Sequence, residues 1–148
     1  MEHIRLKEIA TVLETDEVRD LLLQLEYPQE IRERKTEQII LGYRQNPEWP
    51  LLGLKKDGVL VGLIGLALGN IDSAVIQHIV VRRDYRRCGI GRRMIRAVIH
   101  RFSLREISAE TDKDAVDFYR KCGFSIKSLG EKYPGTERFW CTLGENTN

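Results

Sequence analysis

Hydrophobic residues recur at helical spacing in the first third of the chain and predict two helices. The apolar positions of the first helix are Val18, Leu21, Leu22 and Leu25. Thr15 lies just before them and can cap the N-terminus of this helix, and Pro28 is predicted to end it. A second helix is predicted over residues 29–44, where the apolar positions are more scattered. A short strand within residues 3–9 precedes both helices.

Continuous apolar runs follow in the middle of the chain and predict strands. Residues 51–68 have the pattern of a hairpin, because Asp57 and Gly58 favour the positive φ angles of a tight turn. The strand over 59–68 is apolar on both faces, which is typical of a central strand covered on each side, although periodicity alone leaves a buried helix as the alternative. A further strand over 74–81 ends where a cluster of arginines begins.

From residue 89 the spacing becomes helical again. The apolar stripe of this amphipathic helix comprises Ile90, Met94, Val98 and Phe102. A strand over 104–111 follows. A short helix then begins near Asp112, its predicted N-cap, and stops at Gly123.

Two closing strands, 124–129 and 138–143, flank a turn at 133–136 and complete an α/β (α+β) domain. Its sheet is predicted to be mixed but mostly antiparallel, with about six to seven strands and helices on both faces. A strand, helix, strand crossover lies in the second half. At 148 residues the chain has room for one domain and a sizeable core, so residues 1–148 are predicted to form a single domain.

Composition indicates a globular cytoplasmic protein. Hydrophobic residues make up 42% of the chain, and no apolar run approaches the ~20 residues of a membrane span, so no membrane partner is expected. The first residues are charged and lack the apolar centre of a secretory signal. The three cysteines and three histidines form no ligand pattern, which predicts reduced thiols and no metal site.

Charge is unevenly placed although the formal net charge is only +2. Residues 82–101 contain eight arginines and one acidic residue, whereas residues 1–50 contain eleven acidic and seven basic residues. A compact anion is therefore expected near the middle of the chain. The acidic N-terminal part, including Glu26, Glu30 and Glu48, could face a cationic partner or simply form solvated helix surfaces.

The stretch DYRRCGIGRRM, residues 84–94, is where this anion would bind. A strand that turns directly into a helix presents unpaired backbone N–H groups and the positive end of the helix dipole. The alternative is a solvated basic helix start. The stretch fits neither the dinucleotide fingerprint, since Met94 replaces its third glycine, nor the P-loop. Nucleic-acid binding is not expected, because Tyr85 is the one aromatic residue among the arginines.

Two motifs in this half of the chain resemble those of the GNAT superfamily of acetyl-coenzyme A dependent N-acetyltransferases. Arg86, Gly89 and Gly91 occupy the places of its motif A, Q/R-x-x-G-x-G/A. The stretch DAVDFYRKCGF, residues 114–124, is similar to motif B, commonly A-x-x-F-Y-x-x-x-G-F. The motifs stand in the family's order and at its usual separation, and the similarity covers about residues 51–143. The resemblance implies the GNAT fold, with acetyl-coenzyme A as cosubstrate and no metal.

By this resemblance, the backbone N–H groups of residues 87–92 wrap the coenzyme A pyrophosphate, and the strand before them holds the pantetheine arm. In the family this strand and the next one splay apart, and the thioester lies in the gap. A backbone N–H near Val80 or Val81 would meet the oxyanion. The coenzyme-binding residues expected on this basis are Ile79, Val80, Val81, Arg86, Arg87, Cys88, Gly89, Ile90, Gly91, Arg92, Asp112, Phe118 and Tyr119.

The resemblance also assigns catalytic roles. Tyr119 is expected to be the general acid that protonates the departing coenzyme A thiolate; from spacing alone it could be a half-buried aromatic residue of its helix. Some relatives use a glutamate on the strand before motif A as base, and this strand offers only Gln77 and His78. Glu110 and His78 are therefore candidate bases, and a water chain without a dedicated base is the alternative.

The predicted activity is acetyl transfer to a primary amine of a small molecule or protein by direct attack in a ternary complex. The acidic N-terminal half favours a cationic acceptor. Asp112 departs from the asparagine that many relatives place there, which weakens a side-chain contact to the coenzyme. A non-catalytic acyl-coenzyme A binding or sensing module is the alternative function. The chain is expected to be a monomer or a homodimer.

Overall fold

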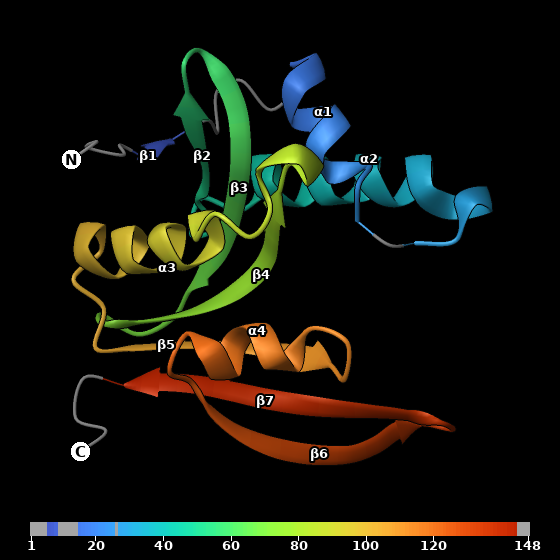
Figure 1. Ribbon diagram of the computed structural model, residues 1–148, viewed down its shortest axis with the longest axis vertical. Coiled ribbons are helices and arrows are strands. Elements are labelled where there is room, and N and C mark those ends of the chain that lie inside the picture. The colour runs from blue at the N-terminus through green and yellow to red at the C-terminus, as the bar shows by residue number, and fades with distance from the viewer. Residues whose placement is uncertain (1–5, 9–14, 26, 145–148) are drawn as a thin grey trace.

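A seven-stranded sheet with strand order β1-β2-β3-β4-β5-β7-β6 organises the chain in a computed structural model (Figure 1). The model describes residues 6–8, 15–25 and 27–144. The strands are β1 (Leu6–Glu8), β2 (Leu51–Lys56), β3 (Val59–Leu68), β4 (Ser73–Val81), β5 (Glu106–Asp112), β6 (Ser125–Tyr133) and β7 (Thr136–Gly144). The helices are α1 (Asp16–Leu22), α2 (Gln29–Gln45), α3 (Ile90–Arg101) and α4 (Val116–Lys121), with a short 3₁₀ helix, η2, at Arg83–Tyr85.

Every neighbouring pair in the sheet is antiparallel except β4 and β5. These two strands are parallel, and α3 forms the crossover between them. The expected mostly antiparallel mixed sheet with one strand, helix, strand crossover is therefore confirmed.

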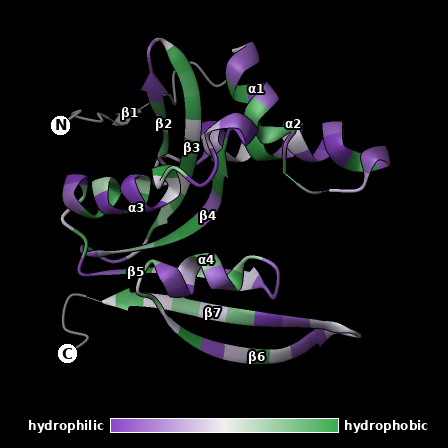
Figure 2. Ribbon diagram, in the orientation of Figure 1, coloured by the Kyte–Doolittle hydropathy of each residue, from purple (hydrophilic) through white to green (hydrophobic). Residues whose placement is uncertain are grey.

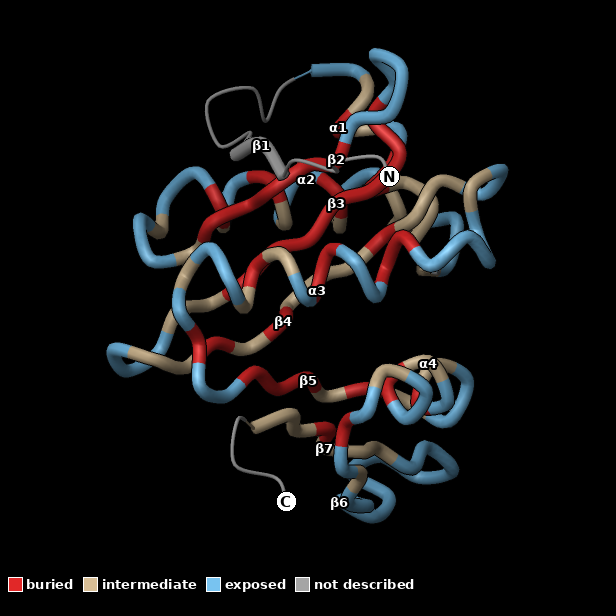
Figure 3. The backbone as a smooth tube through the Cα atoms, turned by 60° about the vertical axis from the view of Figure 1, so that its left-hand side comes forward, coloured by how far each residue is buried: buried red, intermediate tan, exposed pale blue. Residues whose placement is uncertain are grey.

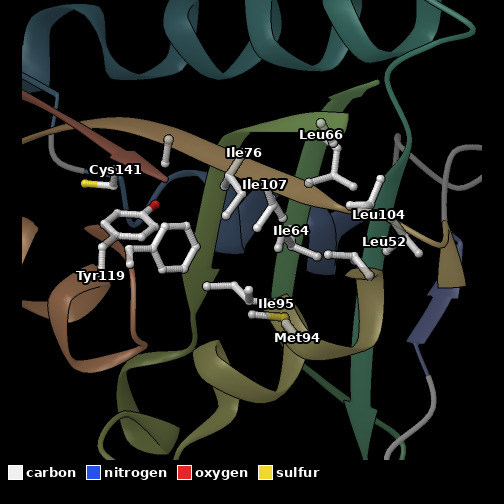
Figure 4. Close-up of a cluster of buried hydrophobic side chains, with 14 of the residues drawn as sticks. Leu52, Ile64, Leu66, Ile76, Met94, Ile95, Leu104, Ile107, Tyr119 and Cys141 are labelled. Carbon is white, nitrogen blue, oxygen red and sulfur yellow. The ribbon is translucent and has the colours of Figure 1, made fainter. Parts of the chain in front are cut away.

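Helices cover both faces of the sheet and bury a separate apolar cluster on each (Figures 2 and 3). The larger cluster lies under α3 and α4 and includes Ile64, Ile76, Met94, Ile107 and Tyr119 (Figure 4). The smaller one lies under α1 and α2 and includes Leu21, Ile40, Tyr43, Leu63 and Val80. The strand β3 contributes to both clusters, which is why its sequence is apolar at nearly every position.

Several local predictions are confirmed. Thr15 caps α1, since its hydroxyl oxygen accepts a hydrogen bond from the Val18 N–H. Asp57 and Gly58 form the β2–β3 turn with φ angles of 52° and 79°. Gly123, with a φ of 95°, follows the last residues of α4.

Two predicted boundaries of helices are wrong. The first helix ends at Leu22 rather than at Pro28, because the chain tightens there into i→i−3 turns in which the Gln24 N–H bonds the Leu21 carbonyl oxygen. The helix expected to start at Asp112 starts at Val116. The Asp112 carboxylate instead closes the preceding turn, accepting from the N–H groups of Asp114 and Ala115 at 3.0 Å each.

The C-terminal strands are longer than predicted, since β6 and β7 run up to the turn at Pro134 and Gly135. Most of β6 is exposed on both faces, so its sequence lacks the alternation that marks a half-buried strand. Among the helices of the described residues, none is long and apolar enough to cross a membrane.

Candidate active site

The parallel strands β4 and β5 pair along only part of their length. Ser73–Ile76 of β4 pairs with Glu106–Ala109 of β5, and no pairing continues beyond Ile76 although β4 extends to Val81 and β5 to Asp112. The two strands therefore diverge in the middle of the sheet. This divergence agrees with the expected splay.

A β-bulge in β4 marks the point where the strands begin to diverge. Gly65 of β3 lies opposite His78 and Leu66 lies opposite Ile76, so Gln77 has no partner in the register. The Gln77 side chain replaces the missing ladder contact, because its Nε2 donates to the Leu66 carbonyl oxygen at 3.2 Å. Such a bulge bends its strand and re-aims the residues after it.

Backbone groups beyond the bulge alternate between β3 and the gap. The Arg82 N–H donates to the Val61 carbonyl oxygen at 2.7 Å, so the two-residue period turns Val80 toward β3 and Ile79 and Val81 away from it. The Val81 carbonyl oxygen accepts from the Arg86 side chain at 3.2 Å, consistent with that direction. Ile79 and Val81, rather than Val80, thus present their N–H groups to the gap.

The loop from β4 to α3 exposes a row of unbonded backbone donors. Arg87 and Gly89 have left-handed φ angles of 64° and 76°, and Gly89 is the N-cap of α3. Within the part of the chain that the structure describes, the N–H groups of residues 87–92 form no hydrogen bond. The first turn of α3 contains no acidic residue. These six consecutive donors are suited to an anion.

The two motif glycines have different structural roles. A Cβ at Gly89 would meet no atom within 4 Å, so glycine is needed there for its φ angle alone. A Cβ at Gly91 would lie 2.9 Å from two ring carbons of Phe118. Gly91 therefore lets the first turn of α3 pack against α4, which joins the two predicted motifs.

Other predicted binding residues surround this loop. Cys88 is exposed, and its thiol contacts the Arg86 carbonyl oxygen at 3.6 Å. The Arg86 side chain donates a hydrogen bond through Nε to the Val81 carbonyl oxygen. Asp112 is engaged in its own turn through the side chain, so its carboxylate has a structural role.

Tyr119 packs in the larger core cluster with 5% of its surface exposed. Its ring makes edge contacts with Phe118 and Phe124, at centroid distances of 5.0 and 5.2 Å, and lies beside Cys141 in Figure 4. Burial raises the pKa of the phenol, so the hydroxyl keeps its proton. No hydrogen bond to this hydroxyl is found among the described residues.

Glu110 belongs to the diverging part of β5 and is held by two cations. Its carboxylate oxygens lie 2.9 Å from Lys132 Nζ and 3.0 Å from Arg138 Nε. Hydrogen bonds from these two groups lower the pKa of the carboxyl. The side chain is therefore a paired carboxylate that ties β5 to the β6–β7 hairpin.

His78 is bound to a residue that the sequence did not single out. Its Nδ1 lies 2.7 Å from the hydroxyl of Tyr43 in α2, and the two rings make an edge contact with centroids 5.5 Å apart. Burial lowers the pKa of His78 to about 4, so the ring is neutral at physiological pH. Tyr43 is not among the candidates predicted from the sequence; Gly65, a glycine inside an apolar strand that leaves room for the Tyr43 ring, was the available signal.

Neither candidate base is well suited to accept a proton from an amine. Glu110 is already paired, and His78 has a pKa far below neutrality. Of the glutamates considered for a cationic partner, Glu30 and Glu48 are exposed, and Glu26 lies outside the described residues. In the described residues, no group of three His, Cys, Asp or Glu side chains could hold a metal ion.

Comparison with known proteins gives a family match. Residues 15–124 match the model described as the acetyltransferase (GNAT) family. No curated protein matches the chain.

Solved structures share the fold at low sequence identity. The ribosomal-protein-S18-alanine N-acetyltransferase of Escherichia coli superposes with a TM-score of 0.76 at 16% identity, over 99% of this chain and 96% of that one. A spermidine N-acetyltransferase variant from Vibrio cholerae gives 0.71 at 19%, over 96% and 94%. A GNAT family acetyltransferase from Elizabethkingia anophelis, with acetyl-coenzyme A bound, gives 0.68 at 18%, over 97% and 99%.

Proposed function

The chain belongs to the acetyltransferase (GNAT) family, and we propose that it transfers the acetyl group of acetyl-coenzyme A to a primary amine by direct attack in a ternary complex. The acceptor is a small molecule or a protein. The observation that carries this proposal is the row of six N–H groups at residues 87–92, which form no hydrogen bond within the described chain and follow β4, the strand that diverges from β5.

The donors fit the anionic end of coenzyme A. Backbone N–H groups at a helix N-terminus are suited to phosphate oxygens, and the left-handed angles at Arg87 and Gly89 turn the loop around them. Exposed Arg87, Cys88 and Arg92 contribute through the backbone, as do Ile90 and Gly91. The chemistry of the side chains matters less here than the direction of the amides.

The diverging part of β4 fits the pantetheine arm. Ile79 and Val81 offer backbone groups on the side of the gap, and an amide-bearing chain can pair with them as a strand would. Acetyl-coenzyme A supplies an activated thioester when bound. Negative charge develops on the thioester carbonyl oxygen during the reaction. The backbone N–H groups of Ile79 and Val81 are fixed donors that can stabilise this charge.

Tyr119 is the proposed general acid. Its raised pKa keeps the phenol protonated, so the hydroxyl has a proton to donate to the departing thiolate. Phe118, which packs on Gly91, connects the helix of Tyr119 to the phosphate loop.

Proton removal from the amine is proposed to run through water. The carboxylate of Glu110 is shared between Lys132 and Arg138, and it would have to break an ion pair to act as a base. A water chain needs no such change. Proteins with this fold act on acceptors as different as a ribosomal protein and spermidine, so the fold does not select the acceptor.

A pair of glycine variants tests the binding claim. Gly89→Glu places an acidic side chain at the phosphate loop and is expected to abolish coenzyme A binding in calorimetry. Gly58→Glu is the matched control, because Gly58 has nearly the same φ angle and equally open surroundings in the β2–β3 turn. Both changes cost about 1–2 kcal/mol of backbone strain. Equal binding by the two variants would remove the phosphate-loop assignment.

Turnover is tested separately by thiol release. Wild-type protein with acetyl-coenzyme A and a panel of primary amines is expected to release free coenzyme A in an amine-dependent manner. Tight coenzyme binding without release across the panel would leave a binding module and contradict the enzymatic proposal.

A further inference from the structure

Residues from β3, β4 and α2 meet on the sheet face opposite α3 and α4, which we take as the acceptor side of the gap. Gly65 of β3 lies directly opposite His78 of β4, and the Tyr43 hydroxyl from α2 occupies the space beside Gly65. A Cβ at Gly65 would overlap Tyr43 Oη and Cζ. A glycine normally weakens a central strand. Here the missing side chain leaves room for the Tyr43 hydroxyl to reach His78 Nδ1.

The bulged residue Gln77 is held by β3. Its Nε2 donates a hydrogen to the Leu66 carbonyl oxygen. The direction of the hydrogen bond between Tyr43 and His78 follows instead from the partners available to the phenol.

The Tyr43 hydroxyl has one hydrogen of its own to donate. Tyr43 is buried, and among the described residues His78 Nδ1 is the acceptor within reach. Burial raises the Tyr43 pKa, so this hydrogen stays on the phenol. With Nδ1 accepting, a neutral His78 carries its proton on Nε2.

The Nε2 atom is the ring nitrogen left for a ligand. His78 is partly exposed, and its Nε2 forms no hydrogen bond in the described part of the chain. The residue lies in the diverging segment of β4, next to Ile79, on the sheet face opposite α3 and α4. A neutral N–H at this place is a donor and cannot take a proton from an amine.

Resting on the acetyl transfer proposed above, we propose that His78 determines acceptor specificity. Its Nε2–H, fixed by the hydrogen bond from the Tyr43 hydroxyl to Nδ1, donates to a carbonyl or carboxylate oxygen that the acceptor carries next to its primary amine. The substrate class is therefore an amine with an adjacent carbonyl-type oxygen, such as the α-amine of an amino-acid amide or a peptide. In this proposal His78 is a hydrogen-bond donor and not a base, and Tyr43 is the positioning residue that fixes its ring.

The tautomer can be measured without any substrate. In long-range ¹H–¹⁵N spectra of the full chain, the His78 ring is expected to show the Nε2–H pattern and no titration between pH 5 and 8. His78→Asn identifies its signals among those of His3 and His100. In Tyr43→Phe, the ring is expected to lose this fixed pattern. A Nδ1–H tautomer, or a ring that protonates near pH 6.5, would overturn the proposal.

Kinetics with paired acceptors test the specificity. An amino-acid amide is compared with an alkylamine of the same length. His78→Asn keeps an amide group near Nδ1 for Tyr43 but lacks the Nε2–H, and is expected to lower kcat/KM about tenfold for the amide and little for the alkylamine. His78→Gln, which restores an N–H near the Nε2 position, is expected to recover much of the preference.

Failure of the two proposals would look different. If wild-type protein acetylates neither amine, the proposed function fails while the tautomer measurement still stands. If it acetylates both amines and His78→Asn lowers the two rates equally, acetyl transfer stands and the specificity role of His78 is contradicted.

Discussion

Among single residues, Tyr119 allows an effect on stability to be separated most clearly from an effect on catalysis. Its ring packs among aromatic rings, and no hydrogen bond to the hydroxyl is found in the described residues. Because no such bond is lost, Tyr119→Phe is expected to leave the melting temperature almost unchanged. If the hydroxyl is the general acid, kcat falls about 10²-fold with coenzyme affinity retained.

Tyr133→Phe is the control for this prediction, because Tyr133 is an exposed tyrosine at the tip of the β6–β7 hairpin. Its turnover is expected to match the wild type. Unchanged kcat in Tyr119→Phe would show that the hydroxyl takes no part in the reaction. A large loss of melting temperature would instead show that it has a structural partner.

The close approach of Tyr43 to Gly65 gives a second prediction for single residues. Gly65→Ala is expected to destabilise the protein by about 1–3 kcal/mol, because the added methyl overlaps the phenol. Tyr43→Leu removes that overlap, so the double variant is expected to be less destabilised than the sum of the two single variants. Urea unfolding of the four proteins measures the coupling; strict additivity would mean that the phenol can move away without cost.

At the scale of elements, Glu110 joins β5 to the hairpin of β6 and β7. Its pKa is lowered by Lys132 and Arg138, so its ion pairs stabilise the folded state above the ordinary carboxyl pKa of 4.5 and cease to do so as pH falls through the lower folded value. Glu110→Gln is expected to cost up to about 1 kcal/mol at pH 7 and almost nothing near pH 3. Thermal unfolding across this pH range measures the difference, and a constant difference would contradict the ion-pair account.

The helices and strands of the middle of the chain could be predicted because the apolar pattern of each is consistent with its burial. The amphipathic α3, the Asp57-Gly58 turn and the doubly apolar β3 are confirmed in this way. The end of α1 and the start of α4 were not predicted, because both depend on short turns whose hydrogen bonds follow from tertiary packing. Only part of β6 was predicted, since most of its length is exposed.

The parts of the candidate site whose backbone geometry follows from a sequence motif could be predicted. The parts that depend on how β4 pairs with β3 could not. The strand-to-helix turn lies where the sequence predicted it, with Gly89 as the N-cap of α3; the binding role of residues 87–92 stays a prediction. That Ile79 and Val81, and not Val80, face the gap depends on the pairing with β3. The contact between Tyr43 and His78 joins positions 35 residues apart and required the fold.

For the whole molecule, the proposed phosphate and acceptor sites lie on opposite faces of the sheet at the gap between β4 and β5. Residues 87–92 lead into α3, which packs on one face of the sheet, while α2 lies on the other face (Figure 1). On that second face Tyr43 of α2 meets His78. A ligand that spans the gap is therefore expected to stabilise both faces together. At 100 times its dissociation constant, coenzyme A should add about 2.7 kcal/mol and raise the melting temperature by about 5–10 °C.

Amide hydrogen exchange locates that stabilisation within the molecule. In the free protein the amides of residues 87–92 are expected to exchange rapidly, because they have no acceptor in the described structure. Coenzyme A should slow these amides together with those of Ile79 and Val81, which face the gap, by more than the global stabilisation accounts for. Val80, which faces β3, should gain only the global effect, and the exposed tip of the β6–β7 hairpin should be unchanged. Gly89→Glu should erase the whole pattern and Gly58→Glu should keep it. Protection confined to the hairpin would place the coenzyme elsewhere, and protection of residues 87–92 without Ile79 and Val81 would keep the phosphate loop but remove the role of the strand.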